Sequence, residues 1–452
     1  MNIFRKSKSL CPICRKIVAA DIVEKSGSMF MKKTCSEHGS FEIKIAKYAW
    51  YYKGLNIFYD NLYGLDFYKR KNPRVYTSIV VSSKCNLKCP ICFTPNFKNK
   101  EEDISIDFFA KQLEKIKNKK IFVHLSGGGE PTLRKDLPEF IHLITKSGNV
   151  AGLATNGIII AENFDYLMKL KKAGLKTVYM WIDTIRNEEI HRKMRGGNFI
   201  QIKMKALENL KKAKIPVQFF QVVAKGVNEN EIEDCLEFSR KNQFISTFRV
   251  RGYNFLGKKG FLPEQEFTAA DEFIETIANH SKNLFNIEDA YYMQKINLAI
   301  SAIFNNPRCY RAQVIFVPRN KEKSLRDTFH FKEFSRTLEE FEKIWQENPL
   351  RAKRYFLKKY LSRLIRNPKL AYVFAKKRLS RFHWNYSTQK YYLAILANPS
   401  YSPLNCDLDR MRQECPNIAF NQDLTKNIPH CLELMLIDTY ATQENFKFEN
   451  WD

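Results

Sequence analysis

Three closely spaced cysteines are the residues in this sequence with the clearest capacity for chemistry. Cys85, Cys89 and Cys92 follow an apolar run, residues 75–81, that we expect to be a β-strand. Three thiolates at a strand end can hold an iron–sulfur cluster from one side, so that one iron of a four-iron cluster stays open to another ligand. An open coordination position indicates catalysis more than structure. A zinc knuckle and a disulfide clip are the simpler alternatives.

A second set of metal-ligand residues stands near the N-terminus. Cys11 and Cys14 form one pair, and Cys35 and His38 form another about twenty residues later. Two such pairs joined by a hairpin-like segment are typical of a closed tetrahedral Cys3His site. Because protein would fill all the positions, we expect a structural metal, with zinc as the first choice and mononuclear iron as the second.

Glycine and polar residues follow the next three apolar runs, where we expect strands to end. Glycine lets a backbone approach a ligand closely, and an asparagine side chain offers both a donor and an acceptor. Taken singly, each of these residues is equally well explained by a turn or a helix cap. The glycine-rich turn also lacks the Lys-Ser/Thr tail of a P-loop. The residues are Gly128, Gly129, Glu130, Thr155, Asn156 and Asp183.

The elements that must position these residues alternate along residues 74–310. Apolar runs of strand length are separated by segments whose apolar residues recur at three- and four-residue steps, as in amphipathic helices. Six strand–helix units in series predict an α/β fold, a partial (β/α)6 TIM-like barrel. Chemistry in such folds gathers at the carboxyl ends of the strands. The predicted strands are 75–82, 121–125, 150–154, 177–183, 217–223 and 247–251.

Together these motifs resemble those of the radical S-adenosylmethionine (radical SAM) enzymes. The spacing Cys-x3-Cys-x2-Cys resembles the cluster motif of that family, and Gly-Gly-Glu-Pro at 128–131 resembles its motif for the methionine end of SAM. The resemblance implies that the three cysteines ligate a catalytic 4Fe-4S cluster whose open iron binds SAM. It also implies that the six glycine and polar residues named above line the cofactor site. Reductive cleavage of SAM would yield a 5′-deoxyadenosyl radical that abstracts hydrogen from a substrate carbon.

Two departures and one further likeness refine this resemblance. Ile91 precedes the third cysteine, where the family often has an aromatic residue, and Thr184 follows Asp183, where it often has glycine. The segment 191–197 resembles the His-x-x-x-Arg-Gly of many members. The N-terminal cysteine/histidine set ahead of such a core resembles a subgroup that includes archaeal tetraether lipid synthases and pterin-precursor methyltransferases.

The cysteines toward the C-terminus leave two alternatives open. Related enzymes often carry an auxiliary 4Fe-4S cluster after the barrel, and four cysteines would ligate one completely. The spacings are wide and match no pattern, so scattered buried thiols explain them equally well. The cysteines are Cys309, Cys406, Cys415 and Cys431.

The charge of the chain is strongly positive and uneven. The formal net charge is +27, and residues 351–390 contain thirteen Lys and Arg and no Asp or Glu. Apolar residues within 356–365 recur on one helical face, as in helices that bind an anionic membrane surface. A core-facing helix with a solvated basic side is the alternative. Nucleic acid would satisfy the same charges, but no base-stacking module is recognisable.

These observations divide the chain into four parts and predict its function. We expect a metal-binding unit at 1–45, an aromatic-rich linker at 46–73, the barrel at 74–310 and a mostly helical, basic region at 311–452. Because no signal peptide or membrane span is recognisable, we expect a cytoplasmic protein, peripheral at the inner membrane face.

The expected function is that of a radical SAM enzyme that modifies the alkyl chain of a membrane lipid, with an electron donor such as ferredoxin or flavodoxin. Methyl transfer to a pterin-like molecule and RNA modification are the enzymatic alternatives. A basic nucleic-acid-binding protein without activity is the remaining one, and it leaves the strand-end motifs unexplained.

Overall fold

The computed structural model describes residues 2–64, 76–92, 103–126, 128–255, 263–304, 311–319, 331–366, 390–399, 401–414 and 417–419. The chain forms two compact units. Unit 1 comprises Met1–Asn72, Phe267–Arg381 and Gln389–Cys415, and unit 2 comprises Pro73–Glu266, Phe382–Thr388 and Pro416–Asp452.

Unit 2 contains a parallel sheet, and the six predicted strands are confirmed. They lie side by side in chain order, and a short strand, β13 (Asn417–Ala419), is added in parallel beside β5. Each strand begins or ends within a few residues of the predicted position. The strands are β5 (Tyr76–Val80), β6 (Phe122–Ser126), β7 (Val150–Thr155), β8 (Thr177–Trp181), β9 (Val217–Val223) and β10 (Ile245–Gly252).

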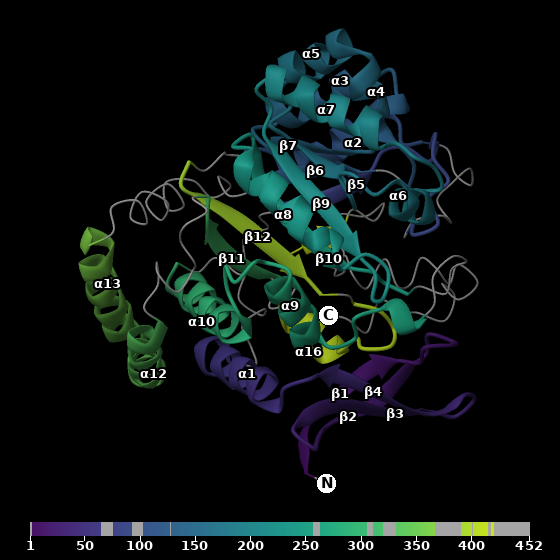
Figure 1. Cartoon of the computed structure of the whole chain (residues 1–452). Helices are drawn as coiled ribbons and strands as arrows, with labels where there is room; N and C mark the ends of the chain where they lie inside the picture. The colour runs from purple at the N-terminus through teal and green to yellow at the C-terminus, as the bar shows by residue number, and fades with distance from the viewer. Residues whose placement is uncertain are drawn as a thin grey trace. The chain divides into compact units, whose positions relative to one another are not determined.

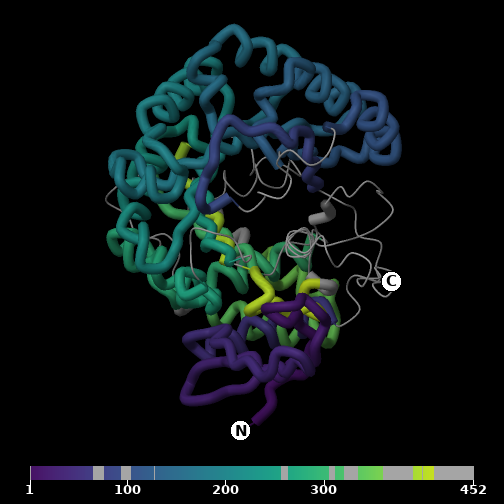
Figure 2. The backbone as a smooth tube through the Cα atoms, turned by 90° about the vertical axis from the view of Figure 1, so that its right-hand side faces the viewer, coloured from purple at the N-terminus to yellow at the C-terminus, as the bar shows by residue number. Residues whose placement is uncertain are grey.

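Helices connect these strands and lie along one face of the sheet, which makes the unit a partial barrel (Figure 1). In Figure 2 the blue and teal segments of this unit bend into an arc. Side-chain caps on Ser105, Asn163 and Asn187 begin three of the helices, since each accepts a backbone N–H from the residue three positions on. The helices are α2 (Ile106–Glu114), α3 (Leu137–Lys146), α4 (Ile158–Glu162), α5 (Phe164–Ala173), α6 (Glu188–Arg195), α7 (Ile200–Lys212) and α8 (Glu231–Lys241).

The two faces of this sheet have different side chains. Phe219 of β9 and Phe248 of β10 are fully buried, and the Phe219 ring also contacts Phe238 of α8. Alternate residues of a strand point to opposite faces, so their neighbours in sequence line the interior of the barrel. A cluster of aromatic residues that includes Phe122, Tyr179 and Phe220 lies there.

Unit 1 begins with a four-stranded antiparallel sheet in the order β1-β2-β3-β4. Its strands are β1 (Ile3–Leu10), β2 (Ile17–Lys25), β3 (Ser28–Cys35) and β4 (Gly39–Ala46). Ile22, Met29, Met31 and Ile45 are buried in its small core. The other elements of the unit are α9 (Ala270–Asn279), α10 (Ile287–Ile303), β11 (Gln313–Pro318), α12 (Phe331–Glu347), α13 (Pro349–Arg366), β12 (Tyr392–Asn398) and α16 (Leu408–Glu414).

The segment expected to be a linker is largely a helix, α1 (Ala49–Tyr63). Its aromatic residues are the reason, because they pack: Phe58 is fully buried, and the Tyr63 hydroxyl donates to the carbonyl of Leu298 in α10 (2.9 Å). Tyr51 likewise donates to the Gln313 side chain (2.8 Å). Through these contacts α10 joins unit 1, so the units divide at residue 266 and not at the expected 310.

The first part of the basic segment forms helix α13, and its apolar side is partly occupied. Phe356 is almost completely buried and packs on Phe341 of α12, with ring centroids 5.1 Å apart. Arg354, Lys358 and Lys359 are exposed. This arrangement is the one expected of a core-facing helix with a solvated basic side. Residues 367–389 of the segment lie outside the described residues. Within the described part of the chain, no helix is long and apolar enough to span a membrane.

Candidate functional site

The loop that carries Cys85, Cys89 and Cys92 is attached by its backbone to the glycine-rich turn after β6. The Gly129 N–H donates to the Ser82 carbonyl (2.8 Å), and the Glu130 N–H donates to the Lys84 carbonyl (2.7 Å). A Cβ on residue 129 would lie 1.9 Å from the Lys84 oxygen. Only glycine therefore allows this approach, and Gly129 lies immediately beside the start of the cysteine loop.

The end of β7 is attached to the same loop through Asn156. Its side-chain amide donates to Asn86 Oδ1 (2.7 Å), and its own Oδ1 accepts from the Ile158 N–H (3.1 Å). The residue after Cys85 is thus tied to the third strand end. The structure brings the first three strand-end motifs together, as expected from the sequence.

The carboxylate of Glu130 is directed into the protein. It is 3% exposed and accepts from Thr132 Oγ1 (2.6 Å), Thr155 Oγ1 (2.7 Å) and the Asn156 N–H (2.7 Å). Burial raises the pKa of this carboxyl, although these hydrogen bonds oppose the shift. The side chains of Glu130 and Thr155 therefore hold one strand end to the next, and Gly128 lies buried in the same turn.

The carboxylate of Asp183 is also engaged by the protein. It is fully buried and accepts two hydrogen bonds from Arg195 (2.5 and 3.0 Å) and one from the Val222 N–H (3.0 Å). Burial alone would raise the pKa of the Asp183 carboxyl. The guanidinium of Arg195 lowers this pKa by more, so the net shift is downward. Asp183 thus orients Arg195, although the sequence suggested contact with the cofactor.

Helix α6 brings Arg195 to the cysteine loop. The Ile91 N–H donates to the Met194 carbonyl (3.5 Å), and a Cβ on Gly196 would lie 3.0 Å from the Lys88 oxygen. Burial lowers the pKa of Arg195, but the Asp183 carboxylate and the Cys89 thiolate raise it more. A fixed cation beside a thiolate stabilises the deprotonated form that ligates iron.

Lys203 of α7 is a further buried cation that the sequence pattern did not indicate. Its side chain is 1% exposed, and Nζ donates to the Trp181 carbonyl (2.5 Å). Burial lowers the pKa of Lys203 to about 8. With Arg195 it makes the surroundings of Cys89 positive, which suits an anionic assembly of thiolates and cluster.

The three cysteines fit the donor set of a 4Fe-4S cluster. All are half-buried and form no disulfide. Each ligand of such a cluster binds a different iron, so its sulfurs need not converge on one point. Accordingly, the sulfur atoms of Cys85, Cys89 and Cys92 do not form a group within 4.8 Å of one another, the spacing expected around a single metal ion. These thiolates would hold the cluster, and the backbone at Gly128 and Gly129 and the Asn156 side chain would face the molecule bound to its open iron.

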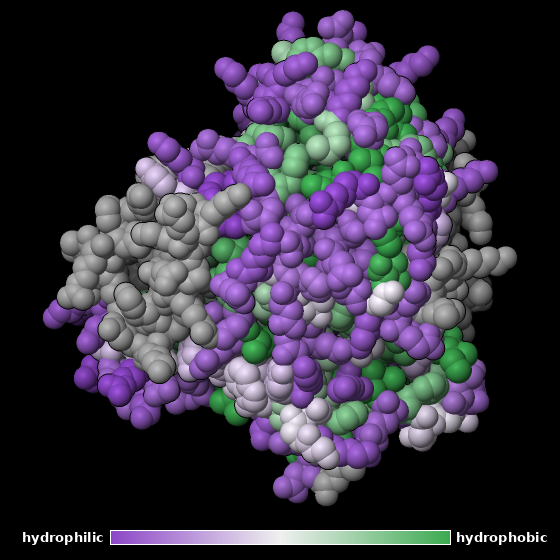
Figure 3. Space-filling model, in the orientation of Figure 1, coloured by the Kyte–Doolittle hydropathy of each residue, from purple (hydrophilic) through white to green (hydrophobic). Residues whose placement is uncertain are grey.

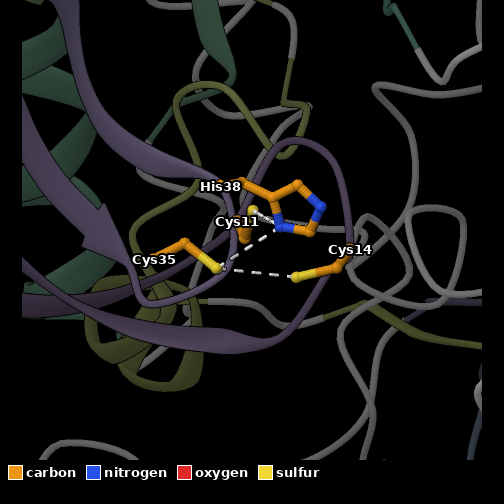
Figure 4. A group of neighbouring side chains, drawn as sticks. All are labelled: Cys11, Cys14, Cys35 and His38. Atoms are coloured by element: carbon orange, nitrogen blue, oxygen red, sulfur yellow. Dashed lines mark hydrogen bonds between the residues drawn. The ribbon is translucent and has the colours of Figure 1, made fainter.

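The N-terminal ligands do converge on one point. The ligand atoms of Cys11, Cys14, Cys35 and His38 all lie within 4.8 Å of one another. Figure 4 shows the four side chains pointing toward one another, with Cys35 Sγ 3.6 Å from His38 Nδ1 and 3.8 Å from Cys14 Sγ. The His38 ring lowers the pKa of the Cys35 thiol to about 6, which favours the thiolate. This donor set fits one tetrahedral metal ion.

Removing one of these ligands is expected to release the metal. In Cys14→Ala, zinc measured by plasma mass spectrometry should fall from about one equivalent per chain to near zero, because Cys3His sites need all their ligands. The melting temperature should fall, because metal binding contributes to folding. Glu37→Gln, which changes an exposed side chain next to the site, serves as the control. Full zinc content in Cys14→Ala would contradict the assignment of these ligands. Iron instead of zinc in the unmodified protein would identify the bound metal as iron.

Cys406 is the described member of the four C-terminal cysteines. It is fully buried in unit 1, with Sγ 3.5 Å from Ser9 Oγ of β1. The buried Lys33 donates there to Ser9 Oγ (3.0 Å) and to the carbonyls of Leu10 (2.9 Å) and Leu404 (2.9 Å). Cys309, Cys415 and Cys431 lie outside the described residues, so the auxiliary cluster stays a prediction.

Comparisons with known sequences agree with this geometry. Residues 79–239 match the sequence model of the Radical SAM superfamily, and residues 3–47 match that of the HMPTM N-terminal zinc ribbon domain. The chain thus carries a radical SAM domain preceded by a zinc ribbon. Members of this superfamily use a 4Fe-4S cluster and SAM.

Particular relatives can also be named. The chain is 36% identical over 272 residues to the 7,8-dihydro-6-hydroxymethylpterin dimethyltransferase of Methanocaldococcus jannaschii, covering 56% of this chain and 52% of the relative. It is 32% identical over 169 residues to a probable GTP 3′,8-cyclase of Archaeoglobus fulgidus, covering 37% of this chain and 55% of that protein. The chain therefore spans about half the length of these relatives.

Among solved structures, the chain resembles in part Streptococcus suis SuiB bound to the precursor peptide SuiA. The TM-score is 0.41 at 18% identity, with 47% of this chain and 46% of that chain covered.

Proposed function

We propose that this chain is a radical SAM enzyme whose substrate is a small, polar, planar molecule, as in methyl transfer to a pterin-like heterocycle. The attachment of the cysteine loop to Gly129 and Asn156 supports the first part, because it joins the proposed cluster ligands to the turn that resembles the SAM-binding motif. A bound cluster would supply the electron that cleaves SAM and so provide the radical.

The residues of the chain have distinct roles in this proposal. Cys85, Cys89 and Cys92 hold the cluster, and Arg195, oriented by Asp183, keeps a positive charge beside Cys89. Glu130 holds the ends of β6 and β7 together, so that the backbone at the glycine-rich turn keeps its position.

The interior of the barrel supports the choice of substrate. Tyr76, Phe122 and Tyr179 contribute aromatic rings, and His124 lies between them, with its ring 4.2 Å from that of Tyr179 and its Nδ1 2.8 Å from the Tyr76 hydroxyl. An alkyl chain would offer only apolar contacts to a wall that also carries polar groups. A heterocycle with ring nitrogens and an amino group can pair with them. The dimethyltransferase named above, a pterin enzyme by its name, agrees with this choice.

Hydrogen abstraction provides the test. Anaerobically reconstituted protein would be given SAM, dithionite and a dihydropterin deuterated at its ring carbons and side chain. We expect deuterium in the released 5′-deoxyadenosine and a corresponding loss of deuterium from the pterin, both measured by mass spectrometry. Release of 5′-deoxyadenosine that stays free of deuterium, with an unchanged pterin, would contradict this substrate class. A complete lack of release would contradict the radical mechanism.

Modification of a lipid alkyl chain is a second candidate, because α13 exposes basic residues and no acidic residue occurs in 351–390. In this case the protein would bind peripherally to an anionic membrane. On the face drawn in Figure 3, however, hydrophobic residues appear in separate patches within a mostly hydrophilic surface. Flotation with anionic liposomes that weakens as salt rises would support this candidate. Binding to RNA but not to liposomes would favour RNA modification instead.

A further inference from the structure

One cation inside the barrel of unit 2, Arg249, has no counter-charge among the residues that the structure describes. Phe248 and Val250 of β10 are fully buried on the helix-covered side, so the alternate residues Arg249 and Arg251 face the interior. None of the strands β5 to β10 contains an Asp or Glu, whereas they contain two Arg and one His. The inner wall is therefore positively charged or neutral.

Arg249 is held in place but not neutralised. Its Nε donates to Gln218 Oε1 (2.5 Å), and its guanidinium lies 5.0 Å from the centre of the Tyr179 ring. The hydrogen bond to Gln218 holds one edge of the guanidinium, and the Tyr179 ring contacts one of its faces. With the part of the chain that the structure describes, Arg249 forms no ion pair and its terminal nitrogens donate no hydrogen bond. The residue is half-buried, so part of it stays exposed.

Arg249 also belongs to a row of side chains that leads toward the cysteine loop. In the register of the sheet, Trp181 lies opposite Phe220, and Phe220 lies opposite Arg249. The Trp181 and Phe220 rings are 3.8 Å apart between centroids, and Trp181 is half-buried. Arg195, which contacts Cys89, lies 5.9 Å from the Trp181 ring on the other side. The row thus runs from the cation at Arg249, across an aromatic surface, to the cluster ligands.

We propose that this row is the substrate subsite, in which Arg249 binds an oxyanion and Trp181, packed on the buried Phe220, supports a planar ring. The inference rests on the proposed function and specifies its substrate class: a heterocycle that carries a carboxylate or a phosphate. The planar guanidinium, with one edge held by Gln218, presents its free edge for a two-point contact, the geometry that carboxylate and phosphate share. A ring bound on Trp181 would have its carbons near the cysteine loop, where the radical is formed.

The absence of a counter-charge favours this class over an uncharged substrate. A half-buried arginine without an anion has lost part of its hydration and gained little in exchange. An anionic ligand recovers that loss, whereas an alkyl chain would increase it. Recognition through Arg249 would therefore separate charged heterocycles from their uncharged parents.

Two pairs of probes that differ only in the anionic group test the proposal: pterin with pterin-6-carboxylate, and guanosine with guanosine monophosphate. Binding to the reconstituted protein in the presence of SAM would be measured by fluorescence for the pterins and by equilibrium dialysis for the nucleosides. We expect the charged member of at least one pair to bind about 10- to 100-fold more tightly, the effect of a charge-assisted hydrogen-bonded pair. Preference within the first pair assigns a carboxylate, and preference within the second assigns a phosphate.

Substitutions locate the effect. Arg249→Met should remove the preference, and Arg249→Lys should keep only part of it, because lysine retains the charge without the planar fork. Lys212→Met, which removes an exposed cation on α7, should leave it unchanged. Iron content and melting temperature establish that each variant is folded. An unchanged preference in Arg249→Met, or no preference in the unmodified protein, would overturn the proposal. Release of 5′-deoxyadenosine without any probe tests the proposed function separately, so the two failures are distinguishable.

Discussion

Replacing Cys89 by alanine should abolish the release of 5′-deoxyadenosine from protein that has been reconstituted with iron and sulfide and supplied with SAM and dithionite. Cys89 is the thiolate beside Arg195, and its loss would leave the cluster with two protein ligands. Even an indirect partner of a metal ligand is worth about 10- to 100-fold, so a lost ligand should cost more than about 100-fold in rate. Liquid chromatography with mass detection measures the product, and iron and sulfide analysis measures the cluster.

A matched control separates ligation from general damage. Cys235→Ala removes another cysteine of unit 2, one that is fully buried in helix α8 and lies outside the Cys-x3-Cys-x2-Cys motif. Iron, sulfide and 5′-deoxyadenosine should stay near their original levels in that variant. If Cys89→Ala retained the cluster and still released 5′-deoxyadenosine, the cluster would have to be held by other residues. This result would contradict the assignment of the cofactor site.

The exchange of Gly129 for alanine should detach the cysteine loop from the glycine-rich turn. The added Cβ would lie 1.9 Å from the Lys84 oxygen and 2.8 Å from the Lys84 nitrogen, and backbone atoms cannot rotate away as a side chain can. Overpacking usually costs about 1–3 kcal/mol, and a contact with backbone should reach the upper end or exceed it. We expect a lower melting temperature, a reduced iron content and weaker SAM binding by calorimetry.

A second glycine provides the comparison for this substitution. Gly226 has a positive φ of +71°, and a Cβ there would meet nothing within 4 Å. Asparagine tolerates this backbone conformation, so Gly226→Asn should change stability by less than about 1 kcal/mol and leave the iron content as it was. If Gly129→Ala behaved like Gly226→Asn, the close approach at Lys84 would not be what positions the cysteine loop.

Much of unit 2 could be predicted because its strands are short apolar runs and its helices are amphipathic. Periodicity of this kind indicates burial, since most residues that face the core are apolar. The positions of the Cys-x3-Cys-x2-Cys, Gly-Gly-Glu-Pro and Thr-Asn-Gly motifs at successive strand ends followed, because parallel strands bring their carboxyl ends to one edge. The contacts of Gly129 and Asn156 with the cysteine loop confirm this arrangement.

Other features depended on partners that are distant in sequence. The expected linker is the helix α1, whose aromatic residues are buried by α10, more than two hundred residues away. The sequence predicted that Asp183 contacts the cofactor. In the structure its carboxylate accepts two hydrogen bonds from Arg195. Arg249 and Arg251 stand at alternate positions of a predicted strand, so the sequence indicates that they share a face of the sheet. The pattern does not indicate whether this face is the interior of the barrel.

The amino-acid sequence by itself determined the metal-binding character of this protein, the kind of its sheet and the order of its motifs along the strands. Each of these depends on residue type and local spacing. The tertiary structure alone decided which side chains are occupied by the protein. Glu130 and Asp183 face protein donors, whereas Arg249 faces no acidic side chain in the described part of the chain. The physical reason is that a charge is neutralised by whatever lies within a few ångströms, and the fold, not the spacing in the chain, places groups at that distance.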